Sequence, residues 1–130
     1  MKNGFTVSTL LPAVPEKVFR AWLSTEGHSA MTGSPAKVEP RVGGLFTAWD
    51  GYITGKTLEL KPYTRIVQAW RTTEFPEKSP DSKIEILLEK NGEGTKLTLI
   101  HTNIPDGQAN DYEGGWEDSY FKPMRDYFSS

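Results

Sequence analysis

The chain contains no cysteine, so disulfide bonds and metal sites built on thiolates are both excluded. Histidine is almost as scarce: His28 and His101 lie far apart in the sequence, and a metal site would need carboxylates as well. No apolar run approaches the length of about 18 residues that spans a membrane, and the amino terminus MKNGFTVSTL has no signal-peptide pattern. We therefore expect a soluble, cytoplasmic protein without a metal, another cofactor or membrane insertion.

Neither sign of charge dominates the composition, with 15 basic against 17 acidic residues and a formal charge of −2. No basic stripe is interleaved with aromatic residues, so we expect no nucleic-acid partner. A nucleophile elbow, a P-loop and the zinc-binding HExxH motif are also missing from the sequence. The sequence therefore excludes the enzyme classes that depend on these motifs.

Aromatic residues, by contrast, are plentiful. They make up 12% of the chain and include four tryptophans. A length of 130 residues suits one domain, residues 1–130, with a substantial buried core. So many tryptophans in a small domain favour an apolar pocket that accepts a flat or hydrophobic ligand.

The hydrophobic pattern predicts an α+β domain. Alternating and β-branched residues indicate a strand at 5–11, and apolar residues at helical spacing indicate a short helix at 15–24, followed by a second, broken helix. Turn residues then separate about six strands between residues 34 and 104, and hairpin-length connections imply an antiparallel sheet of six to seven strands in all. A long helix ends the chain, with Asp111 as its expected cap. Since a sheet of this size curves, we expect the helix to cross its concave face.

The last segment, GGWEDSYFKPMRDYFSS, carries an aromatic stripe when it is wound as a helix. The residues on that side are Trp116, Tyr120, Pro123, Met124, Tyr127 and Phe128. Pro123 interrupts helical hydrogen bonding, so we expect a bend that follows the sheet. Gly114 and Gly115 lack side chains and are expected to allow close approach to a strand. We expect the stripe to roof a partly enclosed apolar pocket.

Three ionisable residues are candidates for a special role. Two of them, Glu117 and His101, each have two interpretations, and His28 has one. Glu117 falls within the apolar arc of the helix, where it either reaches water at the mouth of the sheet or acts as a cavity carboxylate. His101 shares a strand face with Leu97 and Leu99, and is either a hydrogen-bonded core residue or the partner of Glu117 in an acid/base pair. His28 lies in a polar segment and is expected to be solvated.

Three segments resemble the family of the C-terminal domain of the activator of the heat-shock protein 90 ATPase. They are DGYITGKTLELKPYTRIVQAWR, GTKLTLIHTNIP and GGWEDSYFKPMRDYF. The positions that carry the shared pattern are Gly51, Ile53, Gly55, Leu60, Pro62, Arg65, Ile66, Val67, Trp70, Gly94, Thr95, Leu97, Leu99, Ile104, Pro105, Gly115, Trp116, Tyr120 and Phe121. The resemblance covers nearly the whole chain, and it implies the helix-grip fold of the START-related, polyketide cyclase-like superfamily, in which a curved sheet wraps around a long C-terminal helix.

The resemblance also implies a chaperone partner. In the two-domain activators, however, a separate N-terminal domain makes the main contact with the chaperone, and these 130 residues leave no room for one. The chain departs from many stand-alone members at Met31 as well, where those members carry tryptophan, and we expect this difference at the rim of the pocket.

We expect the cavity to be lined by aromatic residues and one histidine, although ordinary core packing is the alternative for each of them. These residues are Trp22, Phe46, Trp49, Trp70, His101, Trp116 and Tyr120. Three functions follow. The favoured one is a module that binds a small hydrophobic or aromatic ligand, since it needs only what the fold provides. The others are a module that regulates a chaperone or contacts another protein, and a small hydrolase or cyclase that uses His101 and Glu117.

Overall fold

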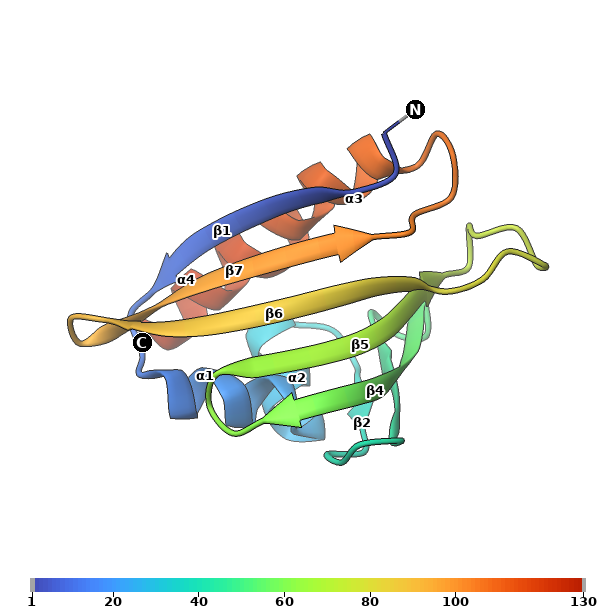
Figure 1. Ribbon diagram of the computed structural model, residues 1–130. Helices are drawn as coiled ribbons and strands as arrows, with labels where there is room; N and C mark the ends of the chain where they lie inside the picture. Colours follow the sequence, from blue (N-terminus) through green and yellow to red (C-terminus); the bar gives the residue numbers. More distant parts are fainter. Residues whose placement is uncertain (1, 130) are drawn as a thin grey trace.

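The computed structural model describes residues 2–129 (Figure 1). Within this range, seven strands form one antiparallel sheet in the order β1-β7-β6-β5-β4-β3-β2. The elements in chain order are β1 (Phe5–Leu11), α1 (Pro15–Trp22), α2 (Thr25–Thr32), β2 (Lys37–Val38), β3 (Leu45–Ala48), β4 (Ile53–Lys61), β5 (Arg65–Thr72), β6 (Ser82–Asn91), β7 (Gly94–Thr102), α3 (Ala109–Gly115), η1 (Trp116–Phe121) and α4 (Lys122–Phe128). The α+β helix-grip fold predicted from the sequence is confirmed.

Short turns account for most of the sheet order. Each strand from β2 to β6 pairs antiparallel with the strand that follows it, as hairpin connections require. The first strand, β1, lies beside the last, β7, with Phe5 opposite His101. The register of β4 against β5 shifts between Thr57 and Glu59. Such a bulge increases the local twist of a sheet and so favours the curvature that the helices occupy.

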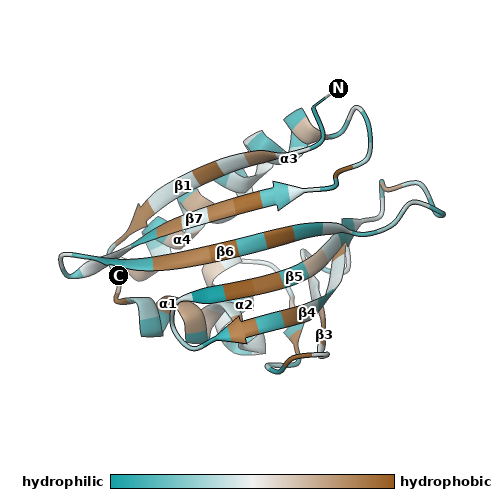
Figure 2. Ribbon diagram, viewed as in Figure 1, coloured by the Kyte–Doolittle hydropathy of each residue, from teal (hydrophilic) through white to brown (hydrophobic). Residues whose placement is uncertain are grey.

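All the helices cover one face of the sheet. In Figure 1 the C-terminal helix runs behind β1 and β7, and α1 and α2 lie behind the lower strands. Figure 2 shows apolar and polar residues alternating along the strands, which is the pattern of a sheet with one buried face. Ile66, Ile84 and Leu99 point into the core and are fully buried. The helices therefore meet an apolar, concave surface.

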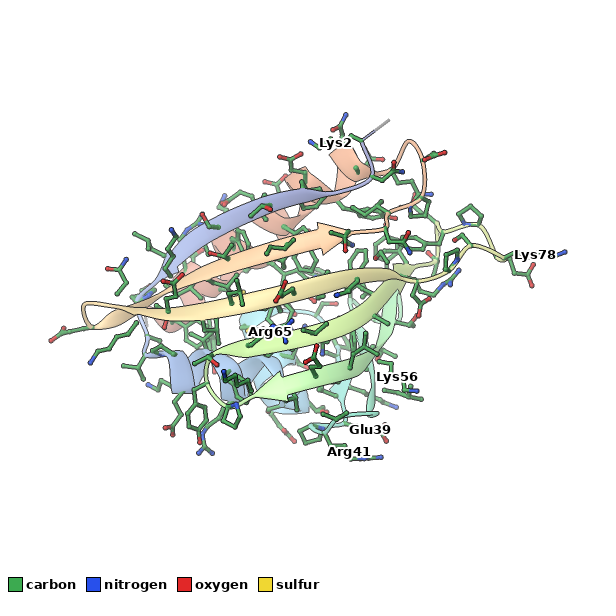
Figure 3. The ribbon with its side chains drawn as sticks, viewed as in Figure 1. Lys2, Glu39, Arg41, Lys56, Arg65 and Lys78 are labelled. Atoms are coloured by element: carbon green, nitrogen blue, oxygen red, sulfur yellow. The ribbon has the colours of Figure 1, made fainter. Side chains whose placement is uncertain are left out.

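The other face of the sheet carries charged side chains. Arg65 of β5 lies on this outer face (Figure 3) and donates hydrogen bonds to Glu59 and Glu85 of the adjacent strands, at 3.0 Å and 2.6 Å. These contacts raise the pKa of Arg65, chiefly through the hydrogen bond to Glu85. Opposite charges on neighbouring strands support the pairing of β4, β5 and β6.

The C-terminal helix is irregular in the middle. Across η1 it widens into a π-helix, in which the Lys122 N–H donates to the Glu117 carbonyl. Pro123 comes directly afterwards, and it has no N–H to donate to the preceding turn. A π-helical segment thus precedes Pro123, and the bend expected at this proline stays a prediction. The helix begins at Ala109, and Asp111 lies in its first turn, so the prediction that Asp111 caps the helix was wrong.

Helix α2 corrects two predictions. His28 is only 2% exposed, although its polar neighbours suggested a solvated position. The prediction failed because one side of even a polar helix faces the core, and His28 is on that side of α2. Met31 also lies within α2 and is 1% exposed, so it is a core residue and not part of a pocket rim.

A candidate ligand cavity beneath the C-terminal helix

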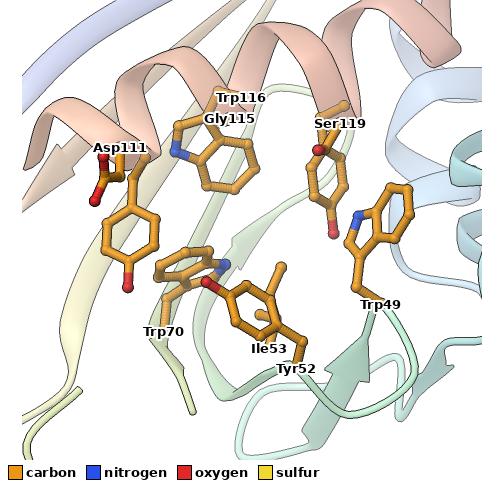
Figure 4. A pocket seen from close by; sticks show the side chains of 10 residues that line it. Trp49, Tyr52, Ile53, Trp70, Asp111, Gly115, Trp116 and Ser119 are labelled. Atoms are coloured by element: carbon orange, nitrogen blue, oxygen red, sulfur yellow. The ribbon is translucent and has the colours of Figure 1, made fainter. Parts of the chain in front are cut away.

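A cavity of about 360 Å³ lies between the C-terminal helix and the strands β4 and β5 (Figure 4). Its volume is within the range of about 300–1,000 Å³ that is usual for small-molecule sites. The residues that line it are Trp49, Tyr52, Ile53, Trp70, Asp111, Tyr112, Gly115, Trp116, Ser119 and Tyr120. Most of them are tryptophan or tyrosine, so the walls consist mainly of aromatic rings.

The helix contributes residues spaced three or four apart, which places them on one face. Each aromatic side chain that the helix contributes to the lining makes a buried hydrogen bond. The Trp116 indole N–H donates to His101 Nδ1 at 3.1 Å, and the hydroxyl of Tyr112 lies 2.7 Å from that of Thr72. The Tyr120 hydroxyl bonds to His28 at 2.8 Å. These anchors fix the roof of the cavity in one arrangement.

Gly115 leaves room for the cavity. A methyl group added at its Cα would meet no atom within 4 Å, and the same is true of Gly114. The prediction that these glycines allow close approach to a strand is therefore wrong. The difference between them is their position: Gly115 lines the cavity, whereas Gly114 is exposed.

The floor of the cavity comes from β5 and from the turn between β3 and β4. Trp70 projects from β5, opposite Gly55 of β4. The ring of Phe46 covers Gly55 so closely that an added Cβ would lie 2.4 Å from the Phe46 Cζ atom. Tyr52 follows the turn and its hydroxyl donates to Glu74, while burial raises the pKa of Tyr52 to about 12. The cavity floor is therefore both aromatic and uncharged at neutral pH.

His101 is a buried anchor behind this wall. Because the Trp116 N–H can only donate, His101 Nδ1 accepts and Nε2 carries the proton, which it donates to the Ser82 hydroxyl at 2.8 Å. Ser82 in turn donates to the Trp70 carbonyl at 2.7 Å. Burial lowers the pKa of His101 to about 3, so the ring is neutral at physiological pH. Both ring nitrogens are occupied within the core.

His28 forms a second buried anchor, which the sequence analysis missed. Its Nδ1 donates to the Trp22 carbonyl at 2.9 Å, since a carbonyl can only accept, and its Nε2 then accepts from the Tyr120 hydroxyl. Burial lowers the pKa of His28 and raises that of Tyr120. The pair is therefore neutral, and it positions the Tyr120 ring at the cavity wall.

Glu117 lies on the solvent side of the helix. Its carboxylate accepts two hydrogen bonds from Arg125, which hold the pKa of Glu117 below its usual value. Arg125 also donates to the Thr9 hydroxyl at 2.8 Å and so ties the helix to β1. Glu117 and His101 thus belong to separate hydrogen-bond networks, and this geometry gives no support to an acid/base pair.

Four of the seven residues expected at the cavity line it, namely Trp49, Trp70, Trp116 and Tyr120. The other three, Trp22, Phe46 and His101, are buried but do not line it. Trp22 packs against Tyr120, with ring centroids 5.1 Å apart.

Sequence reasoning missed the lining residues Tyr52, Ile53, Asp111, Tyr112, Gly115 and Ser119. Helical spacing from Trp116 could have identified Tyr112 and Ser119, four residues before it and three after it. Tyr52 had no comparable signal, because its position depends on the turn that precedes β4.

A curved antiparallel sheet, a long helix across its concave face and an aromatic cavity between them define a START-related, helix-grip domain. The chain belongs to the Activator of Hsp90 ATPase homolog 1-like proteins, whose family model matches residues 12–129. The resemblance seen in the sequence is thereby confirmed.

One curated relative agrees with this assignment, and two solved structures share the fold. The activator of 90 kDa heat shock protein ATPase homolog 1 of Homo sapiens is 32% identical over 114 residues, which cover 88% of this chain and 33% of that protein. The chain thus spans about a third of the length of the curated relatives it matches. The crystal structure of an HSP90 activator from Plasmodium falciparum has a TM-score of 0.90 at 24% identity, over 98% of this chain and 97% of that one. A protein from Chromobacterium violaceum has a TM-score of 0.80 at 27% identity, over 100% and 99% of the two chains.

Residues 2–129 contain neither a candidate membrane-spanning helix nor a candidate metal site. None of the helices there has the length and apolar character that crossing a lipid bilayer requires. In the same part of the chain, no three His, Asp or Glu side chains are grouped so that they could hold a metal ion.

Proposed function

We propose that this domain binds a small hydrophobic, mainly aromatic molecule in the cavity between the sheet and the C-terminal helix. The observation that carries the proposal is the cavity itself, about 360 Å³ in volume and walled by aromatic rings, of which Tyr112, Trp116 and Tyr120 are held by buried hydrogen bonds. Aromatic walls of this kind provide large apolar contact areas and ring-stacking surfaces for a flat ligand. Because these three rings of the helix are already anchored, a ligand would not have to order them on binding.

Gly115 offers a direct test, because a side chain at this position would enter the cavity. We expect Gly115→Leu to abolish binding of uncharged aromatic compounds such as fluorene and flavone. The measurement is the thermal shift of the protein, since a ligand at about 100 times its dissociation constant stabilises the folded state by about 2.7 kcal/mol.

The matched control is Gly114→Leu, the same substitution one residue earlier in the helix, at a position that is open but outside the cavity. This variant should bind as the wild type does. The proposal fails if no compound in a panel of uncharged aromatics, flavonoids and small lipids shifts the wild-type transition, or if both leucine variants bind equally well.

Regulation of a chaperone is the second candidate, and family membership supports it. The human relative is named as an activator of the 90 kDa heat shock protein ATPase, and this chain matches about a third of its length. The test is to measure the ATPase rate of the cognate chaperone with and without this protein. An unchanged rate, together with no co-migration of the two proteins on gel filtration, would rule the candidate out.

A further inference from the structure

One hydrogen-bond donor in the wall of the cavity has no acceptor. Trp70 lines the cavity, and outside the strand ladder its one hydrogen bond among residues 2–129 is the bond that its carbonyl accepts from Ser82. Its indole N–H is therefore unpaired, although the residue is only 4% exposed. Polar groups inside folded proteins are almost always paired, so a specific exception requires an explanation.

A molecule in the cavity can reach the N–H of Trp70. The Trp49 indole nitrogen also lacks a partner, and it is the only buried side-chain nitrogen or oxygen among the described residues that does, so it is closed off from the cavity. The unpaired Trp70 nitrogen is not buried in this way and keeps accessible surface. Because the Trp70 ring packs against Phe75 and His101 elsewhere, that surface faces the cavity. Figure 4 shows this nitrogen on the Tyr52 side of its ring.

The other donors of the lining already have acceptors, with one exception. The indole N–H of Trp116 donates to His101, and the hydroxyls of Tyr52, Tyr112 and Tyr120 donate to Glu74, Gln108 and His28. The exception is the hydroxyl of Ser119, which can either donate or accept and so adapts to either kind of ligand group. An indole N–H can only donate. Trp70 therefore requires an acceptor at one place in the cavity wall.

The charges around the cavity restrict the kind of acceptor. Asp111 is the only residue of the lining with a formal charge, and no Lys or Arg belongs to the lining. A carboxylate or phosphate could accept from Trp70, but it would lose its hydration without gaining a cationic partner. An ammonium group offers only donors and would leave the Trp70 N–H unpaired. The group that fits is a neutral acceptor.

We propose that the ligand is an uncharged, planar aromatic molecule with a neutral acceptor, such as a ketone oxygen, that binds the indole N–H of Trp70. The tilted rings of Trp70 and Trp116, with centroids 5.5 Å apart, provide apolar surface for its aromatic frame. A hydrocarbon that filled the cavity would remove this N–H from solvent without pairing it, which costs free energy. This inference rests on the proposed function and specifies the ligand of the same cavity.

Three matched probes test the inference on the wild-type protein. The molecules 9-fluorenone, fluorene and carbazole share one planar tricyclic frame and differ in the bridging group, which is a carbonyl, a methylene or an N–H group. We expect 9-fluorenone to bind about 3- to 10-fold more tightly than fluorene by isothermal titration calorimetry, because a neutral hydrogen bond contributes a modest net stabilisation. Carbazole is polar at the same position but can only donate, so it should gain nothing over fluorene. Fluorene-9-carboxylate should bind more weakly than its uncharged methyl ester.

Two variants identify the donor. Trp70→Phe removes the accessible indole N–H and should bind 9-fluorenone and fluorene equally well. Trp49→Phe is the matched control, since it removes the other unpaired indole N–H of the lining. In this control the ratio of the two affinities should stay as it is in the wild type.

Nuclear magnetic resonance provides a readout that does not depend on a variant of the core. With the indole signals of the wild type assigned, 9-fluorenone should move the Trp70 indole proton downfield relative to the fluorene complex, because a hydrogen bond to oxygen deshields it. If Trp70→Phe does not fold, this signal decides, and the absence of the shift overturns the inference.

Four further results would overturn the inference and leave the proposed function intact. They are equal affinities of 9-fluorenone and fluorene for the wild type, an equal gain for carbazole, a preference that survives in Trp70→Phe, and tighter binding of the carboxylate than of its ester. Loss of the preference in Trp49→Phe alone would also overturn it. If no uncharged aromatic probe binds the wild type, the proposed function fails and this inference fails with it.

Discussion

At the scale of single residues, three of the four tryptophans show how indole nitrogens can differ. Trp22 donates to the Gln68 side chain at 3.1 Å, and Trp116 donates to His101 at the same distance. Trp49, in contrast, has no acceptor among the described residues. Trp22 and Trp116, which are satisfied inside the core, therefore act as anchors. Composition alone could not separate these roles.

Gly55 provides a stability test at the same scale. A Cβ at this position would lie 2.0 Å from the Ala69 carbonyl oxygen and 2.4 Å from the Phe46 ring. We therefore expect Gly55→Ala to lower the free energy of unfolding by at least about 1–3 kcal/mol, the usual cost of overpacking. Urea denaturation followed by tryptophan fluorescence measures the change.

Gly114→Ala is the appropriate comparison for Gly55→Ala. It places the same methyl group on an open helix position, where it should raise the free energy of unfolding by about 0.5–1 kcal/mol. If the two alanine variants changed stability in the same direction and by the same amount, the close packing of Phe46 over Gly55 would be refuted.

At the scale of elements, the two faces of the C-terminal helix make different contacts. The inner face presents aromatic rings that are hydrogen-bonded to buried histidines. The outer face carries the exposed Glu117–Arg125 pair and the contact of Arg125 with Thr9. The π-helical turn lies between Trp116 and Phe121, and such segments often occur at functional sites. In this helix it coincides with the part that roofs the cavity.

Substitutions on the two faces should therefore have unequal effects. Trp116→Phe leaves the buried His101 Nδ1 without its donor, which should cost about 1–3 kcal/mol of unfolding free energy. Glu117→Gln disturbs a solvent-exposed ion pair, which should change the unfolding free energy by no more than about 1 kcal/mol. Chemical denaturation of both variants provides the comparison, and a larger loss from Glu117→Gln would contradict this division of the helix.

At the scale of the whole molecule, the buried histidines make stability depend on pH. Burial lowers the pKa of both His28 and His101 from the ordinary value of 6.5, to about 3 for His101. Below pH 6.5 the unfolded chain therefore binds protons that the folded protein does not. The free energy of unfolding should be highest above this pH and should fall as the solution becomes more acidic.

The size of this loss can be measured. Between pH 6.5 and the folded-state pKa of about 3, the burial of His101 should reduce the free energy of unfolding by about 1.4 kcal/mol per pH unit. His101→Gln can still accept from Trp116 and donate to Ser82, but it does not titrate. The variant should therefore lose the part of the pH dependence between pH 6 and pH 5 that His101 contributes. The free energy of unfolding is measured by urea denaturation at each pH. If its slope against pH were unchanged in the variant, His101 would not contribute to the pH dependence of stability.

Much of the fold could be predicted from local pattern. Alternation identified β5 to β7, helical spacing identified α1 and the C-terminal helix, and the resemblance supplied the helix-grip arrangement. The errors concern positions that depend on distant contacts. His28 was expected in solvent because its neighbours are polar, and Gly114 and Gly115 were expected against a strand. Neither the depth of a side chain nor an open space can be computed from residue spacing on one element.

The sequence by itself determined the class of fold, the family and the aromatic character of the interior, because periodicity and composition are properties of the chain. Only the tertiary structure decided which aromatic rings line a cavity and which groups are paired. It separated His101 from Glu117, joined His28 to Tyr120 across α2 and the C-terminal helix, and left the Trp49 N–H without an acceptor. The physical reason is that a hydrogen bond or a cavity requires groups from several elements to meet within a few ångströms. That meeting is decided by the packing of the sheet and the helices.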